Sequence, residues 1–270
     1  MTPDAQLQLA ATLGANALPL FAVLLAVLLA AVAISWWLMR AYILPQMRSR
    51  LPQPALVIVN GLIGGTIIIS AAMGFAEIAE ALEPDGTLSR FDEVVTASIS
   101  KNIGTATLQI FALFTRLGDT LTLSLLGVAV AVALWIARWR ALAAGWVLAV
   151  GGNALLNPAL KRVFERVRPL HDHGIVNELG WSFPSGHTSG ATVAYGMLAY
   201  IALNILPPRW QLPALLTATA LAFTVGCSRV FLQVHFVSDV AAGFASGAAW
   251  LTVCIVSVEL SRRYRVRIRR

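Results

Sequence analysis

The sequence predicts an all-α polytopic membrane protein, and three observations carry that prediction. Of its 270 residues, 58% are hydrophobic and only 12% are charged, whereas soluble domains carry about 25% charged residues. The mean hydropathy is +0.74. Several apolar runs reach the length of about 20 residues that a helix needs to cross a bilayer. These features exclude a disordered chain, a coiled coil, a disulfide-rich secreted scaffold and an ordinary cytosolic enzyme.

We expect seven membrane-spanning helices, which proline and charged residues separate. They cover residues 17–39, 55–76, 119–137, 141–160, 187–206, 212–228 and 238–259. The segment 77–118 between the second and third spans is too polar to cross a membrane. Apolar residues recur within it at helical spacing, namely Phe91, Val94, Val95 and Ile99. The spacing predicts an amphipathic helix on the outer surface, which is either a solvated connection or the rim of a lipid entrance.

The basic residues predict the orientation. One side of the predicted topology carries 12 of the 20 Lys and Arg residues. They are Arg40, Arg48, Arg50, Arg138, Arg140, Arg209, Arg262, Arg263, Arg265, Arg267, Arg269 and Arg270. Because short cytoplasmic loops are enriched in these residues, we assign this side to the cytoplasm and the N-terminus to the outside. The basic tail is then a topology anchor or a patch for anionic lipids.

The net charge of +7 would suggest a nucleic-acid partner in a soluble protein, but here membrane topology explains it and no nucleic acid is expected. Cys227 and Cys254 lie in apolar stretches. We interpret them as small residues facing lipid or the bundle, not as a disulfide.

The first polar segment that calls for an explanation runs from Lys161 to Pro169. Lys161 and Arg168 are seven residues apart, so two helical turns would place them on one face, and Pro169 would end the helix. Two cations facing one point suit a phosphate group, which Arg binds in a bidentate manner. The alternative is a pair of charged anchors at a helix end.

The second segment is Pro184-Ser185-Gly186-His187, at the start of the fifth span. Free backbone N–H groups and the helix dipole favour an anion at such a position, and glycine permits its close approach. The Ser185 hydroxyl would be a further donor, an N-cap, or both. His187 would face the bound group, or serve a purely structural role.

The third segment holds Ser228, Arg229, His235 and Asp239. His235 and Asp239 are four residues apart, which would make them neighbours on one helix face. A carboxylate beside an imidazole fixes its tautomer and stabilises its cation. The pair suits a nucleophile, a base, a metal ligand with its orienting partner, or a structural hydrogen bond.

In the predicted topology all three segments meet at the outer membrane face. Together they read Lys, six residues, Arg-Pro; then Pro-Ser-Gly-His; then Ser-Arg, five residues, His, three residues, Asp. This sequence resembles the type 2 phosphatidic acid phosphatase family, which shares its site with vanadium haloperoxidases. The resemblance implies a six-span phosphatase core at residues 55–260. Residues 1–54 would add one span and a cytoplasmic loop, and residues 261–270 would form a basic cytoplasmic tail.

The resemblance also implies a role for each site residue. The phosphoryl group would be bound by Lys161, Arg168, Ser185, Gly186 and Arg229. His235 would attack phosphorus to form a phosphohistidine, and Asp239 would orient it. His187 would protonate the leaving oxygen and then activate water. No metal or other cofactor is expected, because three cations neutralise the phosphoryl charge.

The implied activity is hydrolysis of a lipid phosphate or pyrophosphate at the outer face of the membrane. Because 18 of the 20 basic residues are Arg and the outer loops carry no Asn-x-Ser/Thr sequon, we expect a bacterial origin. The membrane would then be the inner membrane, with the site facing the periplasm. Candidate substrates are undecaprenyl pyrophosphate, which we favour narrowly, phosphatidylglycerol phosphate and phosphatidic acid. The same phosphohistidine would serve a lipid phosphotransferase, which is the alternative. The apolar spans argue against a haloperoxidase, and the intact motifs argue against a non-enzymatic transporter. Oligomeric state is not predicted.

Two further groups of polar residues lie near the motifs. Arg162 and Arg166 are four residues apart, at positions that the family does not fix, and could add positive field for an anionic head group. His171, Asp172 and His173 could bind a metal or a head group, although a solvated loop is the simpler interpretation.

Overall fold

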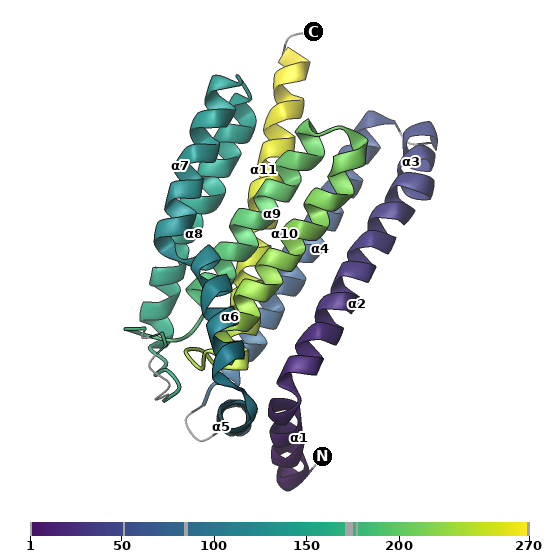
Figure 1. Cartoon of the computed structure of the whole chain (residues 1–270). Helices are drawn as coiled ribbons and strands as arrows, with labels where there is room; N and C mark the ends of the chain where they lie inside the picture. The colour runs from purple at the N-terminus through teal and green to yellow at the C-terminus, as the bar shows by residue number, and fades with distance from the viewer. Residues whose placement is uncertain (1, 51, 84–85, 171–174, 177, 269–270) are drawn as a thin grey trace.

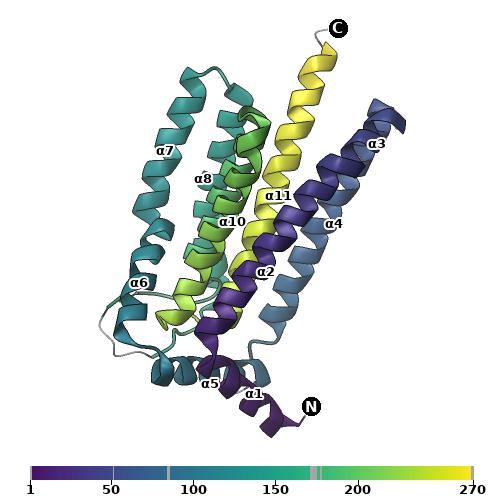
Figure 2. The ribbon, with the colours of Figure 1, turned by 45° about the vertical axis from the view of Figure 1, so that its right-hand side comes forward.

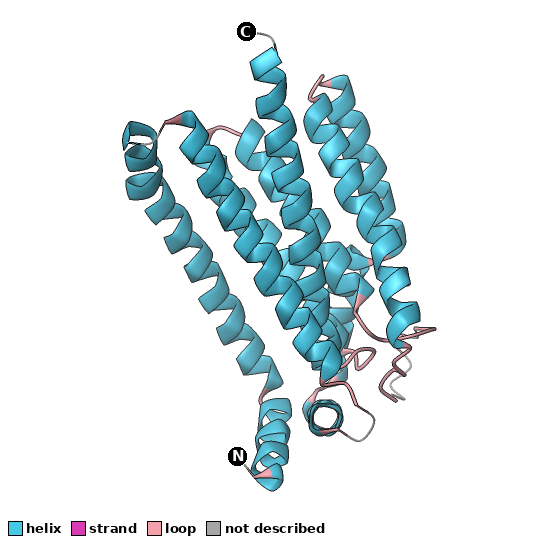
Figure 3. Cartoon of the chain, turned by 180° about the vertical axis from the view of Figure 1, so that it is seen from behind, coloured by secondary structure: helices cyan, strands magenta, loops and turns pink. Residues whose placement is uncertain are grey.

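The protein is a bundle of helices in the computed structural model, which describes residues 2–50, 52–83, 86–170, 175–176 and 178–268. No strand occurs among these residues (Figures 1 and 3). The first helices are α1 (Pro3–Ala15), α2 (Ala17–Leu38), the π-helix η1 (Met39–Ile43), α3 (Leu44–Arg50), α4 (Gln53–Glu80), α5 (Thr87–Asn102) and α6 (Thr105–Thr115). They are followed by the 3-10 turn η2 (Arg116–Gly118), α7 (Thr120–Ile136), α8 (Arg140–Phe164), α9 (Gly186–Ile205), α10 (Pro208–Phe231) and α11 (Val237–Ile268).

A helix forms at each of the seven predicted spans, and the chain is an integral membrane protein. Within the described part of the chain, five helical stretches are long and apolar enough to cross a membrane by themselves. A sixth is the pair α6–α7, bent by 42° at Asp119. The predicted span 187–206 forms α9, which lies outside this set. Its first turns carry polar residues such as Thr188 and Ser189, both buried inside the bundle.

The polar segment between the second and third spans contains the amphipathic helix that its spacing predicts. This helix, α5, buries Val95 and Ile99. It also buries Asp92, a charged residue that lies between these apolar positions in the sequence. The segment differs from prediction in one further respect. Residues 105–115 form α6, an apolar helix that is only 11 residues long.

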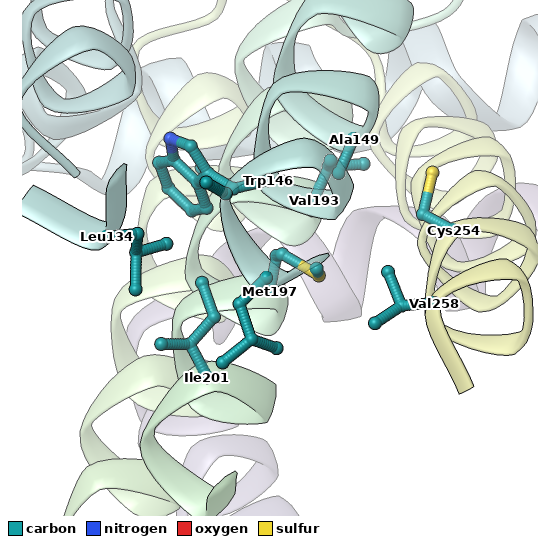
Figure 4. Packing of buried hydrophobic residues seen from close by; sticks show 11 residues of the cluster. Leu134, Trp146, Ala149, Val193, Met197, Ile201, Cys254 and Val258 are labelled. Atoms are coloured by element: carbon teal, nitrogen blue, oxygen red, sulfur yellow. The ribbon is translucent and has the colours of Figure 1, made fainter. Parts of the chain in front are cut away.

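The core of the bundle lies between α7, α8, α9 and α11. Figure 4 shows its packed side chains, with Trp146 of α8 next to Leu134 of α7 and Met197 of α9 close by. Trp146 is fully buried, and its indole N–H donates to the carbonyl of Gly127, 2.8 Å away. Cys254 is buried here as a free thiol, as its apolar surroundings predict.

The N-terminal helices are attached to the outside of this bundle. Helix α2 packs along α10, and α1 packs against α5 across one end of the molecule (Figure 2). Phe21 of α2 contacts Phe111 of α6 and Phe231 of α10, with ring centroids 5.4 and 5.8 Å away. At the other end of α2, Arg40 donates to the side chain of Gln211. The N-terminal span is therefore held at both ends.

Candidate active site

The three polar motifs meet at one end of the bundle. This is the end at which α1 and α5 lie, opposite the C-terminus (Figure 1). The C-terminal ends of α8 and α10 and the N-terminal ends of α9 and α11 converge there. The predicted convergence of the motifs is therefore seen in space.

Lys161 and Arg168 come together, but not by sharing a helix face. Helix α8 ends at Phe164, because Glu165 adopts a left-handed conformation with φ of 44°. The prediction that a helix carries both cations is wrong for this reason. They meet instead at the carbonyl of Trp181, to which the Lys161 ammonium (2.6 Å) and the Arg168 guanidinium (3.3 Å) both donate.

The second motif forms the start of α9. Ser185 is its N-cap, and its buried hydroxyl accepts from the backbone N–H of Thr188 at 3.4 Å. The next residue has no room for a side chain, because a Cβ atom on Gly186 would lie 2.8 Å from Oδ1 of Asn157 on α8. Glycine therefore lets the start of α9 approach α8 closely.

Arg229 is a fully buried cation at the end of α10. It donates to the hydroxyl of Thr115 at 2.6 Å and to a carboxylate oxygen of Glu178 at 2.5 Å. Its Nε–H is buried without a hydrogen-bond partner. A buried donor without a partner carries a desolvation penalty of about 1–3 kcal/mol. Arg229 can therefore bind one more oxygen atom than the protein supplies.

His235 and Asp239 are in contact, although the histidine precedes the helix. His235 lies before α11 begins at Val237, and its Nδ1 is 3.3 Å from Oδ2 of Asp239. The same carboxylate oxygen accepts the backbone N–H of Phe236 at 2.9 Å. The second ring nitrogen, Nε2, faces Arg168 at 3.1 Å. The contact predicted from the spacing is present, but it comes from the turn before the helix.

The surroundings of His235 favour its neutral form. Burial and the positive charges of Arg229, Arg168 and Lys161 hold the pKa of His235 well below 6.5. A histidine that is neutral at physiological pH keeps a lone pair on one nitrogen, and Nδ1–H donation to Asp239 would leave that lone pair on Nε2. The ring therefore suits a nucleophile.

His187 lies in the first turn of α9 and is paired with an acid that the motifs do not include. Its Nε2 is 2.8 Å from Oδ1 of Asp119, the residue before α7. Asp119 stands next to an apolar run and is the N-cap residue of α7. Only its approach to His187 reveals a second carboxylate–histidine pair.

Glu178 is a further site residue that the sequence did not indicate. Its carboxylate touches Arg229, lies 4.0 Å from Arg168 and is 3.9 Å from Nε2 of His187. Burial would raise the pKa of Glu178, but the charges of Arg229 and His187 outweigh it and lower the pKa. The ionised carboxylate thus occupies the point at which three predicted site residues converge.

A cavity of about 460 Å³ opens beside this carboxylate. Its lining includes Arg229, Asp119 and Arg116, together with Gln109 and Leu113 of α6. It provides room for a group larger than phosphate next to the buried cation.

Arg166 does not serve the head-group role that we predicted for it. Its guanidinium turns inward, where it donates to Oδ1 of Asp239 at 2.6 Å and to Oδ2 of Asp92 at 2.9 Å. The prediction is wrong for Arg166, because two buried carboxylates compete for its charge. Arg162 is exposed. His171, Asp172 and His173 lie outside the described residues.

Residues 140–263, which contain all three motifs, match the family model of the PAP2 superfamily. This segment belongs to the type 2 phosphatidic acid phosphatase (PAP2) family. The match begins with α8, so α1 to α7 lie outside it.

Two curated PAP2 relatives match part of the chain. Phosphatidylglycerophosphatase B of Bacillus subtilis is 42% identical over 104 residues, which cover 37% of this chain and 50% of the relative. Lipid A 1-phosphatase of Rhizobium johnstonii is 33% identical over 110 residues, covering 37% of this chain and 41% of the relative. The chain thus spans about half the length of these relatives or less.

A solved PAP2 structure matches a larger part of the fold. The transmembrane PAP2-type phosphatidylglycerolphosphate phosphatase of Bacillus subtilis superimposes with a TM-score of 0.65 at 29% identity. The superposition covers 70% of this chain and 94% of the other.

Proposed function

We propose that this chain is a membrane lipid phosphatase that hydrolyses a lipid phosphate or pyrophosphate through a phosphohistidine. The observation that carries the proposal is the buried Arg229 with its unpartnered Nε–H. An anionic carboxylate, that of Glu178, already lies against its other face at 2.5 Å. A phosphoryl group in the same place would supply oxygen atoms for Arg229, Arg168 and Lys161.

In the first chemical step, Nε2 of His235 attacks phosphorus and forms a P–N bond. The bond from phosphorus to the lipid oxygen breaks, and its electron pair stays on that oxygen. The imidazole becomes cationic, and Asp239, 3.3 Å from Nδ1, stabilises that charge. The buried His235–Asp239 pair, called the dyad below, would hold the imidazole ring in position for this attack.

His187 completes the cycle as acid and then as base. Its Nε2 lies 3.9 Å from the Glu178 oxygen that faces Arg229, the place where we position a phosphoryl oxygen. Asp119 stabilises the protonated ring, which gives its proton to the leaving lipid oxygen. The neutral ring then takes a proton from water as the water attacks phosphorus and the P–N bond breaks.

The names of two matched proteins favour one of the candidate lipids as the substrate. Both the 42%-identical relative and the matching solved structure are named for phosphatidylglycerol phosphate. We therefore place this lipid first, and keep undecaprenyl pyrophosphate and phosphatidic acid as further candidates. The cavity beside Arg229 has room for the glycerol or second phosphate that distinguishes them.

We further propose that the site faces the periplasm of a bacterial inner membrane. The support is the arginine-rich C-terminal segment, which leaves the bundle at the end opposite the motifs (Figure 1). Such segments stay in the cytoplasm.

The test is phosphate release by the purified protein in detergent, with each of the three lipids and with EDTA. We expect phosphate release that persists in EDTA and disappears in His235→Ala. When the lipid phosphate carries 32P, the wild-type protein should retain label as an acid-labile adduct. A lack of release from every lipid would refute hydrolysis. Transfer of label to a second lipid would identify a phosphotransferase instead.

A further inference from the structure

The surface helix α5 contributes a buried carboxylate to the catalytic end of the bundle. Asp92 is 1% exposed, although it belongs to a helix that lies across the outer end of the molecule. It accepts from the backbone N–H of Ser238 at 3.2 Å and from the Ser238 hydroxyl. Ser238 is the immediate neighbour of Asp239, so the hydrogen bonds to Asp92 hold the turn that carries the dyad.

Arg166 joins this carboxylate to the catalytic one. One arm of its guanidinium donates to Asp239 at 2.6 Å and the other to Asp92 at 2.9 Å. The guanidinium also lies 4.2 Å from the centroid of the Phe236 ring. The side chain is thus fixed by contacts on several sides, and only 13% of it is exposed.

The two oxygens of Asp239 have different partners. Oδ2 faces His235 Nδ1 and accepts the N–H of Phe236, whereas Oδ1 accepts from Arg166. An arginine on Oδ1 withdraws negative charge from the oxygen that faces the histidine. A second carboxylate on the same arginine returns part of that charge, because Asp92 and Asp239 share one cation.

We propose that Asp92 and Arg166 are positioning residues that set the charge of Asp239 and thereby the basicity and orientation of His235. The inference rests on the proposed function, in which His235 is the nucleophile. Neither residue needs to touch the substrate. Asp92 acts from the surface helix α5 through Arg166, which contacts both Asp92 and Asp239.

Several other charged groups also face His235, and any titration must allow for them. They are Asp239 of α11, Arg168 of the loop after α8, Lys161 of α8, Arg229 of α10 and His187 of α9. The variants proposed below leave all of these in place. Burial raises the pKa of Asp92 above its ordinary value, although hydrogen bonds from Ser238 and Arg166 and the charge of Arg166 lower it in part.

The test measures the pKa of His235 without any substrate. Protein labelled with [15N]histidine is titrated by NMR in detergent, and His235 is assigned from the spectrum of His235→Gln. Asp92→Asn leaves the Arg166 charge on Asp239 alone, so the pKa of His235 should fall by about half to one unit. Arg166→Gln leaves two neighbouring carboxylates, so it should rise by a similar amount.

Two further variants separate this effect from a loss of structure. The double variant Asp92→Asn/Arg166→Gln restores the charge balance and should return the pKa of His235 close to its wild-type value. Glu93→Gln, which makes the same charge change at the next, exposed position of α5, should leave it unchanged. If the single variants leave the titration of His235 in place, or shift it in the same direction, the proposal is overturned.

Kinetics give an independent result. With phosphatidylglycerol phosphate, Asp92→Asn should lower kcat about tenfold and change KM less than twofold, because Asp92 touches no substrate. An altered KM with unchanged kcat would overturn the positioning role. If the wild-type protein hydrolyses no lipid while the NMR shifts occur as expected, the proposed function fails and the relay from Asp92 to His235 stands.

Discussion

The carboxylate of Glu178 forms an ion pair with the fully buried guanidinium of Arg229, with 2.5 Å between oxygen and nitrogen. It lies where the substrate's phosphoryl group is proposed to bind. An anionic substrate must therefore displace Glu178, and part of its binding free energy is spent in breaking this ion pair. Glu178 thus competes with anions for the same cations.

Replacing Glu178 by Gln should strengthen anion binding. The variant leaves Arg229 without its counter-charge, so we expect the inhibition constant of inorganic phosphate to fall about three- to tenfold. Inhibition by phosphate at constant pH measures this directly. Glu165→Gln is the matched control, because Glu165 is exposed at the end of α8 and should leave the constant unchanged. Weaker inhibition in Glu178→Gln would show that the carboxylate helps to hold the anion.

The acidic limb of the pH–rate profile should lie well below pH 6.5. In the proposed mechanism His235 attacks only when neutral, and burial together with Arg229 and Arg168 lowers its pKa below that value. A lowered histidine pKa means that the neutral form persists as the pH falls, so kcat/KM should decrease only when the pH reaches the lowered pKa. Measuring kcat/KM between pH 4 and 8 tests this, and a limb centred at or above pH 6.5 would contradict it.

Replacing Asp119 by Asn should impair only reactions that require protonation of the leaving group. Asp119 lies 2.8 Å from Nε2 of His187 and stabilises its protonated form. We expect release of a lipid alcohol in a single turnover to slow by about ten- to a hundredfold. Release of p-nitrophenolate, which leaves without a proton, should slow less than threefold.

Glu83→Gln, an exposed residue between α4 and α5, is the control for that experiment. It should leave both rates at their wild-type values. Equal losses for the two leaving groups in Asp119→Asn would mean that Asp119 positions the substrate and does not assist proton transfer.

The helices and the three motifs were predictable from sequence, because apolar length and residue spacing are local properties. The path that brings Arg168 to the site was not, since it depends on the left-handed conformation of Glu165, which the sequence does not signal. The burial of Asp92 was missed for a related reason. Its partner Arg166 is 74 residues away in the chain, and a charged residue in an amphipathic helix normally faces solvent.

Helix α6 was missed because its apolar stretch is too short to span a membrane by itself. It is helical because it packs against α10 and continues into α7 after a bend of 42°. Glu178 and Asp119 have no motif of their own. Only the folded chain brings them to Arg229 and His187, so their roles follow from distances and not from spacing.

The packing of the bundle gives a final prediction, for Trp146. This side chain is fully buried between α7, α8 and α9 (Figure 4). Its indole N–H donates to the carbonyl of Gly127 at 2.8 Å. Trp146→Phe removes that hydrogen bond and leaves a small cavity, so we expect a loss of about 1–3 kcal/mol of unfolding free energy. Thermal unfolding in detergent measures it as a lowered Tm. Trp37→Phe, at a position of α2 that is 52% exposed, should leave the Tm unchanged. An equal Tm for both variants would mean that this core contributes little to the stability of the bundle.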